Sequence, residues 1–160
     1  MKIDLKELAK RLVAEASLQG MTISFAESCT GGMIAASITD IPGASKVFLG
    51  SAVTYSNEAK TGVLGVDSGT IEKNGAVSSQ CAGKMAEGAR RIFGSDIALS
   101  VTGIAGPDGG SEEKPVGTVW FGISVKDATY TFKKNFSGER SDIRGSAAYE
   151  AIASLLERMR

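Results

Sequence analysis

Four short segments carry side chains that could do chemistry, and each lies where an expected strand or helix ends. The first is AESCTGG, residues 26–32, in which Ser28 precedes two glycines. A serine at the start of a helix could act as a nucleophile, because the free amides there can hold a developing oxyanion. Ser28 or Thr30 could instead be an ordinary helix N-cap. Cys29 is another possible nucleophile, but it lacks the histidine that usually activates a thiol.

The second segment is VTYSNEAK, residues 53–60, which places Tyr55, Asn57 and Lys60 after a strand. Polar groups at this end of a strand commonly bind ligands in open α/β sheets. Desolvation lowers the pKa of a lysine, so Lys60 could serve as the base for a nearby serine, with Tyr55 relaying a proton. The alternative is an exposed lysine on a short helix.

The third segment, residues 100–121, reads SVTGIAGPDGGSEEKPVGTVWF and holds five glycines. Many backbone amides after Thr102 and Gly103 would suit a phosphate or an amide-bearing ring, with Gly106 close by. The glycines match neither GxxxxGK[ST] nor GxGxxG, so neither ATP nor a dinucleotide is indicated. A flexible surface turn is the alternative.

The fourth segment, FSGERSDIR, holds Arg140 and Arg144 four residues apart near the start of the last expected helix. Two planar guanidinium groups on one helix face could bind a phosphate. Pairing of either arginine with a surface carboxylate is equally open at this point.

The composition excludes several classes of site. The chain has no histidine, which removes the Ser-His-Asp triad, the Cys-His pair and every His-based zinc site. Two distant cysteines are too few for a Cys-only zinc site, so we expect neither a metal nor a cofactor. Eighteen basic and eighteen acidic residues leave no net charge, so we expect no nucleic-acid partner.

Length and hydropathy indicate one domain, residues 1–160, outside the membrane. The chain has 160 residues, which suits a single core. No apolar run approaches the ~20 residues of a membrane span, and the charged start is unlike a signal peptide. We therefore expect a cytoplasmic protein with no membrane partner.

The elements that must position these segments alternate along the chain. Helical periodicity and capping residues predict helices over residues 4–20, 30–39, 56–64, 67–73, 78–93 and 143–159. β-forming runs predict strands over residues 22–28, 47–55, 96–103, 116–125 and 129–136, the last two joined as a hairpin by residues 126–128. This order predicts a three-layer α/β/α sandwich with a mixed, largely parallel sheet plus an antiparallel hairpin.

Taken together, the segments closely resemble the CinA carboxy-terminal domain family, the nicotinamide-nucleotide amidohydrolases. The resemblance covers nearly the whole chain from about Thr22 to Arg144. It is carried, in order, by AESCTGG, TDIPGAS, VTYSNEAK, LGV, GAVS, VTGIAGPDGGSEEKPVGTVWF and FSGER.

The resemblance implies hydrolysis of nicotinamide mononucleotide to nicotinic acid mononucleotide and ammonia, a step of pyridine nucleotide salvage, without metal or cofactor. It implies Ser28 as nucleophile, Lys60 as its base and Tyr55 as an assisting group. The other residues expected to bind this small-molecule nucleotide are Thr30, Gly31, Gly32, Asn57, Thr102, Gly103, Gly106, Arg140 and Arg144. The amides near Gly31 would hold the oxyanion, and Arg140, with Arg144 as second choice, would bind the phosphate.

Two other functions remain open from the sequence. The glycine loops could belong to a nucleotide-binding module without chemistry, or the protein could be an amidase for a different amide. Ammonia release from nicotinamide mononucleotide separates these possibilities. The amphipathic terminal helices could also bury a face between subunits, so we expect a homo-oligomer, with a dimer favoured.

Overall fold

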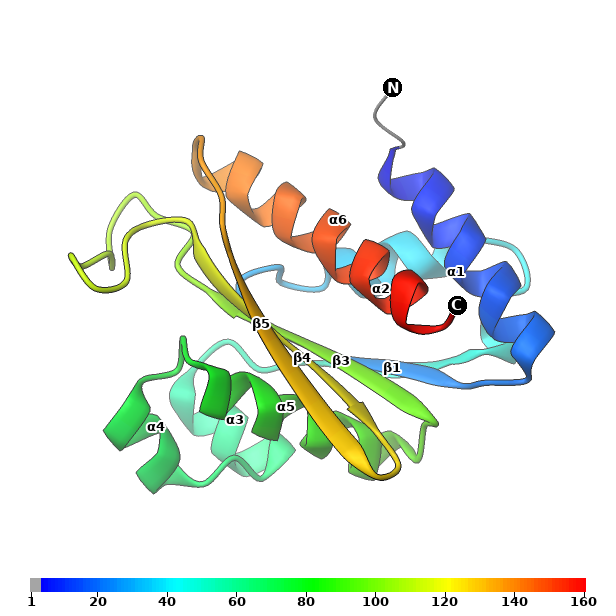
Figure 1. Cartoon of the computed structure of the whole chain (residues 1–160), viewed down its shortest axis with the longest axis horizontal. Coiled ribbons are helices and arrows are strands. Elements are labelled where there is room, and N and C mark those ends of the chain that lie inside the picture. The colour runs from blue at the N-terminus through cyan, green and yellow to red at the C-terminus, as the bar shows by residue number, and fades with distance from the viewer. Residues whose placement is uncertain (1–3) are drawn as a thin grey trace.

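A five-stranded sheet covered by helices on both faces forms the protein (Figure 1), and the computed structural model describes residues 4–160. One face carries α1 (Leu5–Gln19), α2 (Met33–Thr39) and α6 (Arg140–Arg158). The other face carries α3 (Asn57–Leu64), α4 (Ser68–Asn74) and α5 (Ser79–Phe93). The predicted three-layer α/β/α sandwich is confirmed.

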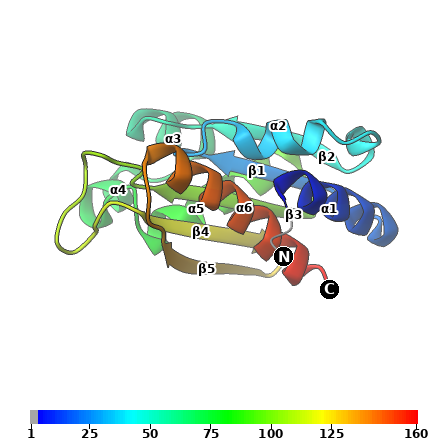
Figure 2. The same ribbon diagram turned by 90° about the horizontal axis from the view of Figure 1, so that it is seen from above.

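The sheet is mixed, with the strand order β2-β1-β3-β4-β5. Its strands are β1 (Ile23–Glu27), β2 (Phe48–Val53), β3 (Ile97–Gly103), β4 (Thr118–Val125) and β5 (Ala128–Asn135). The neighbours β2, β1 and β3 run parallel, whereas β4 and β5 form an antiparallel hairpin beside β3 (Figure 2). The predicted combination of a parallel core with a hairpin is confirmed.

The strand that precedes the first candidate segment lies in the centre of the molecule. Every residue of β1 is buried, because β2 and β3 flank it and helices cover both faces. A large apolar core lies under α1, α2 and α6, and a smaller one lies beside α5. Ser28 therefore directly follows a strand that is fully buried in the core.

Side-chain caps fix the starts of three helices that the sequence predicts. A side-chain oxygen of Asp4 accepts a hydrogen bond from the amide three residues on, at 2.7 Å. Ser56 and Ser78 do the same at 3.0 and 3.1 Å. Each cap satisfies an amide that would otherwise lack a partner, so the predicted starts of α1, α3 and α5 are confirmed.

Several predicted boundaries are wrong by one to three residues: the last helix begins at Arg140 rather than 143, and the strands expected over 47–55 and from 116 are Phe48–Val53 and Thr118–Val125. The helix expected from Thr30 begins at Met33, because Gly31 and Gly32 take left-handed φ angles of 60° and 102° and form a turn. The hairpin connection has two residues rather than three, since Ala128 already pairs with Val125. A short 3-10 helix at Ala44–Lys46 was not predicted.

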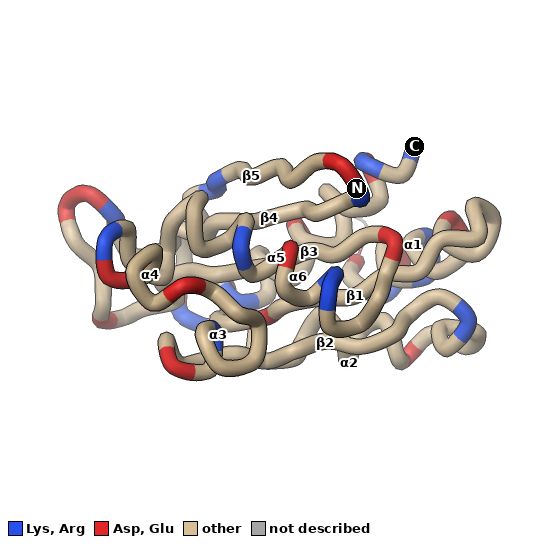
Figure 3. Tube along the Cα trace, turned by 90° about the horizontal axis from the view of Figure 1, so that it is seen from below, with Lys and Arg blue, Asp and Glu red and all other residues tan. Residues whose placement is uncertain are grey.

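Charged residues of both signs are interspersed on the face formed by α3, α4 and α5 (Figure 3). Within residues 4–160, no helix is both long and apolar enough to span a bilayer. The same residues contain no cluster of three or more histidine, cysteine or acidic side chains that could hold a metal ion.

Candidate active site

The candidate site lies at the carboxyl ends of β1 and β2, which the sheet holds side by side. Ser28 directly follows β1, and its amide donates to the Val101 carbonyl of β3 at 3.1 Å. The Thr54 amide, just after β2, donates to the Glu27 carbonyl at 2.9 Å. The two chain segments that carry the predicted chemistry thus leave the sheet together.

Lys60 joins Ser28 from the first turn of α3. Helical side chains lean toward the helix N-terminus, so the amine of Lys60 reaches back over the residues that precede α3. Its Nζ donates to the carbonyls of Thr54 at 2.8 Å and Tyr55 at 3.0 Å. The same nitrogen lies 3.0 Å from Ser28 Oγ, so the structure brings the predicted nucleophile and base into hydrogen-bond contact.

Burial favours the neutral form of the Lys60 amine. The side chain is 1% exposed, and desolvation lowers its pKa from the ordinary lysine value. None of the ion pairs within residues 4–160 includes Lys60, so no carboxylate there holds the charge in place. A neutral amine could keep both carbonyl contacts and turn its lone pair toward Ser28 Oγ, which is the arrangement of a general base.

The neighbouring thiol is poorly suited to attack. Cys29 is 5% exposed, and burial raises the pKa of its thiol to about 11. A thiol in this state is mostly protonated at neutral pH and therefore weakly nucleophilic. Burial also raises the pKa of Cys81, at the start of α5. Ser28 is accordingly the better nucleophile.

A cavity of about 260 Å³ opens beside the pair. Its wall includes most of the residues that the sequence singles out: Ser28, Tyr55, Asn57, Lys60, Thr102, Gly103, Gly106 and Arg140. They come from the ends of β1, β2 and β3, the loop after β3, and the starts of α3 and α6. Such convergence at the carboxyl ends of strands is typical of ligand sites in open α/β folds.

Arg140 bridges two walls of the cavity. Its guanidinium donates to the Gly106 carbonyl at 2.6 Å and to the Tyr55 hydroxyl at 3.0 Å. Tyr55 is 62% exposed, which places this bridge at the solvent side of the cavity. A guanidinium there is suited to an anionic group on a bound molecule.

Gly103, which ends β3, and Gly106, in the loop after it, occupy positions in the cavity wall where a side chain would be unfavourable. A Cβ on Gly103 would lie 2.7 Å from a methyl group of Val119, and Gly106 has a left-handed φ of 79°. The Thr102 hydroxyl donates to the Ala76 carbonyl at 3.0 Å and so ties the wall to the loop before α5. These positions serve the close approach of backbone segments around the cavity.

Four predicted site residues do not line the cavity: Thr30, Gly31, Gly32 and Arg144. The Thr30 hydroxyl donates to Glu27 at 2.9 Å, and the Gly31 amide donates to the Ser28 carbonyl at 3.0 Å. Arg144 instead donates to the carbonyls of Cys29 at 2.8 Å and Thr30 at 3.3 Å. These residues shape the turn that carries Ser28.

Sequence reasoning missed two carboxylates. Asp108 is the one acidic residue in the cavity wall, and its place in the glycine loop could have suggested a ligand contact. Glu27 is fully buried at the end of β1. A carboxylate that ends an apolar strand needs several hydrogen-bond donors nearby, and this requirement was the available signal.

Known proteins are similar to this chain in both sequence and fold. Residues 5–159 match the CinA C-terminal domain family. The nicotinamide-nucleotide amidohydrolase PncC of Enterobacter agglomerans is 50% identical over 153 residues, which cover 95% of the chain and 93% of that protein. A CinA-like protein of Petrotoga mobilis is 52% identical over 139 residues, and there the chain spans only 34% of the relative's length.

Solved structures agree with the fold. A CinA superfamily protein of Klebsiella pneumoniae superposes with a TM-score of 0.95 at 34% identity, covering 98% of both chains. A competence/damage-inducible protein of Agrobacterium tumefaciens gives a TM-score of 0.93 at 39% identity, again covering 98% of both chains.

Proposed function

The chain belongs to the CinA C-terminal domain family, and we propose that it is an amidohydrolase that converts nicotinamide mononucleotide to nicotinic acid mononucleotide and ammonia. The observation that carries this proposal is the contact of 3.0 Å between Lys60 Nζ and Ser28 Oγ in the wall of a cavity of about 260 Å³. The identity of 50% with a protein named as a nicotinamide-nucleotide amidohydrolase supports the choice of substrate.

The first half of the reaction forms an ester on the enzyme. Neutral Lys60 accepts the hydroxyl proton of Ser28 as Oγ attacks the carboxamide carbon, and the carbonyl oxygen becomes an oxyanion. Backbone amides in the turn after Ser28 stabilise that oxygen, and one such donor lowers the barrier by about 3 kcal/mol. Lys60 then passes the proton to the amide nitrogen, the C–N bond breaks and ammonia leaves.

The second half releases the acid. A water molecule attacks the ester carbon while Lys60 takes its proton, and the bond to Ser28 Oγ breaks as Lys60 returns the proton to the serine. The products are nicotinic acid mononucleotide and the free enzyme. The positive charge of the pyridinium ring withdraws electrons from the carboxamide carbon and so assists both attacks.

The rest of the cavity wall binds the nucleotide. Arg140, at the solvent side, binds the 5′-phosphate, with Tyr55 orienting the guanidinium through its hydroxyl. Thr102, Gly103 and Gly106 lie along the ring and ribose. Two further wall residues hydrogen-bond to the sugar hydroxyls: the carboxylate of Asp108, as acidic residues commonly do in nucleotide sites, and the amide group of Asn57.

Steady-state ammonia release tests the proposal. Wild-type protein should release ammonia from nicotinamide mononucleotide, and Ser28→Ala and Lys60→Ala should not. A panel with nicotinamide, its riboside and the dinucleotide then defines which parts of the substrate are needed. Tight binding of nicotinamide mononucleotide without ammonia release would instead indicate a binding module, and turnover of another amide would reassign the substrate.

Three further expectations belong to the same proposal. The chain acts as one domain of residues 1–160, it assembles as a homodimer, and it works in the cytoplasm without a nucleic-acid partner. The interspersed charges of Figure 3 support the last point, because nucleic-acid binding needs a surface of one sign. Light scattering in solution tests the dimer, and a filter-binding assay with DNA tests the expected absence of DNA binding.

A further inference from the structure

The turn that carries Ser28, residues 28–32, is held by two charged side chains, Glu27 of β1 and Arg144 of α6. Glu27 holds it from within the molecule and is 0% exposed. One carboxylate oxygen accepts from the Thr30 hydroxyl at 2.9 Å and the Ile34 amide at 3.0 Å. The other oxygen accepts from the Ser51 hydroxyl at 2.8 Å and the Ala35 amide at 3.2 Å. Glu27 thereby joins the turn to the first residues of α2 and to β2.

The hydrogen bonds of Glu27 limit which backbone amides can stabilise an oxyanion. The free amides at the start of a helix can stabilise an anion, but those of Ile34 and Ala35 already donate to Glu27. The Gly31 amide is also used, since it donates to the Ser28 carbonyl. An oxyanion must therefore find its donors elsewhere in the turn.

Arg144 of α6 holds the same turn through two backbone carbonyls. Its Nε donates to the Cys29 carbonyl at 2.8 Å, and its Nη2 lies 3.3 Å from the Thr30 carbonyl. The approach is close, because a Cβ on Gly31 would lie 3.1 Å from Nη2. Both guanidinium contacts are with backbone carbonyls, and Arg144 does not line the cavity.

The Gly31 hydrogen bond and the Arg144 contact fix the two peptide groups that flank Cys29. In a trans peptide the carbonyl and the N–H lie on opposite sides. The Gly31 contact turns the Ser28 carbonyl inward, so the Cys29 amide faces away from the turn, and Cys29 lines the cavity. The amide of the residue after the nucleophile is the usual oxyanion donor in strand–turn–helix hydrolases. Within residues 4–160, the Cys29 amide donates to no backbone carbonyl and to no side chain of another residue; its one interaction is with the Cys29 thiol itself.

We propose that Glu27 and Arg144 are positioning residues that clamp the turn, so that Ser28 Oγ stays at Lys60 and the Cys29 amide points at the oxyanion. The catalytic part of this inference rests on the proposed hydrolysis of nicotinamide mononucleotide. It assigns Arg144 to the enzyme's own backbone rather than to the substrate phosphate, which Arg140 binds.

Kinetics of Arg144→Met and Glu27→Gln test the clamp. Each should lower kcat for nicotinamide mononucleotide by about 10²-fold with KM nearly unchanged, because a misplaced nucleophile affects the chemical step rather than binding. Arg144→Lys keeps one donor and should recover part of kcat. A raised KM with normal kcat in Arg144→Met would overturn the proposal and make Arg144 a substrate ligand.

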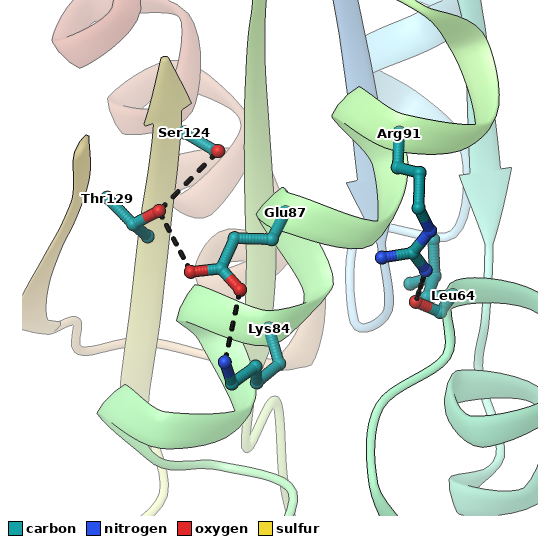
Figure 4. A network of polar contacts seen from close by, with 6 residues as sticks. All are labelled: Leu64, Lys84, Glu87, Arg91, Ser124 and Thr129. Carbon is teal, nitrogen blue, oxygen red and sulfur yellow. Dashed lines mark hydrogen bonds and ion pairs between the residues drawn. The ribbon is translucent and has the colours of Figure 1, made fainter. Parts of the chain in front are cut away.

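Two matched controls come from polar contacts of α5 whose residues do not line the cavity (Figure 4). Arg91 donates to the Leu64 carbonyl at 2.8 Å, so Arg91→Met removes the same kind of contact at a turn without Ser28. Glu87 accepts from Thr129 at 3.0 Å and Lys84 at 3.2 Å, so Glu87→Gln matches Glu27→Gln. Both controls should keep kcat and KM. Equal losses of kcat in controls and test variants would mean a general structural effect and overturn the proposal.

Hydrogen exchange gives a readout that does not depend on activity. In Glu27→Gln the amides of Ile34 and Ala35 should exchange about ten-fold faster, and in Arg144→Met residues 29–32 should do so. The two controls should leave both segments unchanged. Unaltered exchange in both test variants overturns the clamp whether or not the substrate is turned over. Absence of ammonia release from wild-type protein contradicts the proposed function alone, and the exchange experiment still decides the clamp.

Arg144→Met is the safer variant for folding, because it removes a half-buried side chain and leaves the core intact. Glu27→Gln changes a fully buried group. Its kinetics and hydrogen exchange must therefore be interpreted together with its circular dichroism spectrum and its unfolding midpoint. If Glu27→Gln fails to fold, Ser51→Ala replaces it, since this change removes one donor to the same carboxylate. It should raise exchange at Ala35, and unchanged exchange there would count against the clamp.

Discussion

Lys60 Nζ and Ser28 Oγ lie 3.0 Å apart, and the lysine's other two contacts are backbone carbonyls. A neutral amine has two N–H bonds and one lone pair. Because Thr54 and Tyr55 supply the two acceptors, the direction left for the lone pair is toward Ser28. The geometry therefore suits proton transfer from the serine to the lysine as soon as Lys60 loses its own proton.

Ser28→Ala should reduce ammonia release by about 10⁴-fold or more, since removal of a nucleophile abolishes the covalent route. Ser28 is small and mostly buried at 7% exposure, so the fold should persist, with a change in unfolding free energy of about 1 kcal/mol. Steady-state ammonia assays and chemical denaturation measure the two effects. Near-normal ammonia release would show that another group attacks.

Activity should rise with pH through the pKa of Lys60. The base must be neutral, burial lowers the pKa of this amine, and the neutral fraction grows as pH increases past that value. The profile of kcat/KM should thus show an acid limb whose midpoint lies below the ordinary lysine pKa, followed by a plateau. Stopped assays across overlapping buffers measure it. Activity that is flat in pH down to the denaturing range would exclude Lys60 as the base.

Both cysteines should resist alkylation in the folded protein. At pH 8 a thiol of pKa about 11 is ionised in about one molecule in a thousand, and Cys29 and Cys81 are both buried. Intact mass after iodoacetamide treatment should show no adduct in buffer and two in denaturant. Rapid modification of Cys29 in the native state would show that its thiol is reactive and would make it a candidate nucleophile.

Arg140→Met should weaken binding of the phosphorylated substrate specifically. Loss of a charge-assisted contact to phosphate should raise KM for nicotinamide mononucleotide by about ten-fold or more, and KM for the riboside should change little. Arg91→Met is the control, because Arg91 lies outside the cavity wall. An equal increase in KM for both substrates would mean that Arg140 stabilises the cavity wall and does not bind the phosphate.

Two glycines in neighbouring helices should respond oppositely to alanine. A Cβ on Gly88 of α5 would lie 2.2 Å from the Leu64 carbonyl oxygen, so Gly88→Ala should destabilise the protein by about 1–3 kcal/mol. Nothing lies near the corresponding position of Gly62 in α3, so Gly62→Ala should stabilise it by up to about 1 kcal/mol through helix propensity. Urea unfolding of both variants compares them, and a neutral Gly88→Ala would mean that α5 can shift away from α3.

Local sequence signals predicted most elements because their causes are local. Ser56 and Ser78 cap the helices that follow them, and the apolar periodicity of the last helix matches its buried face. The helix expected from Thr30 begins at Met33 instead, because Gly31 and Gly32 form a turn with left-handed φ angles. The carboxylate of Glu27 accepts hydrogen bonds from the Ile34 and Ala35 amides in the first turn of α2, a pairing that helical periodicity does not reveal.

The amino-acid sequence by itself determined which chemistry was available: the absence of histidine excluded histidine-based catalysis, and the ends of predicted elements offered Ser28, Tyr55, Lys60 and two arginines as candidates. Only the tertiary structure decided their partners. Arg140 and Arg144 lie one helical turn apart on α6, yet one reaches the cavity and the other the turn after Ser28. That division depends on how α6 packs across the sheet against β3, a contact between distant segments that spacing along the chain does not encode.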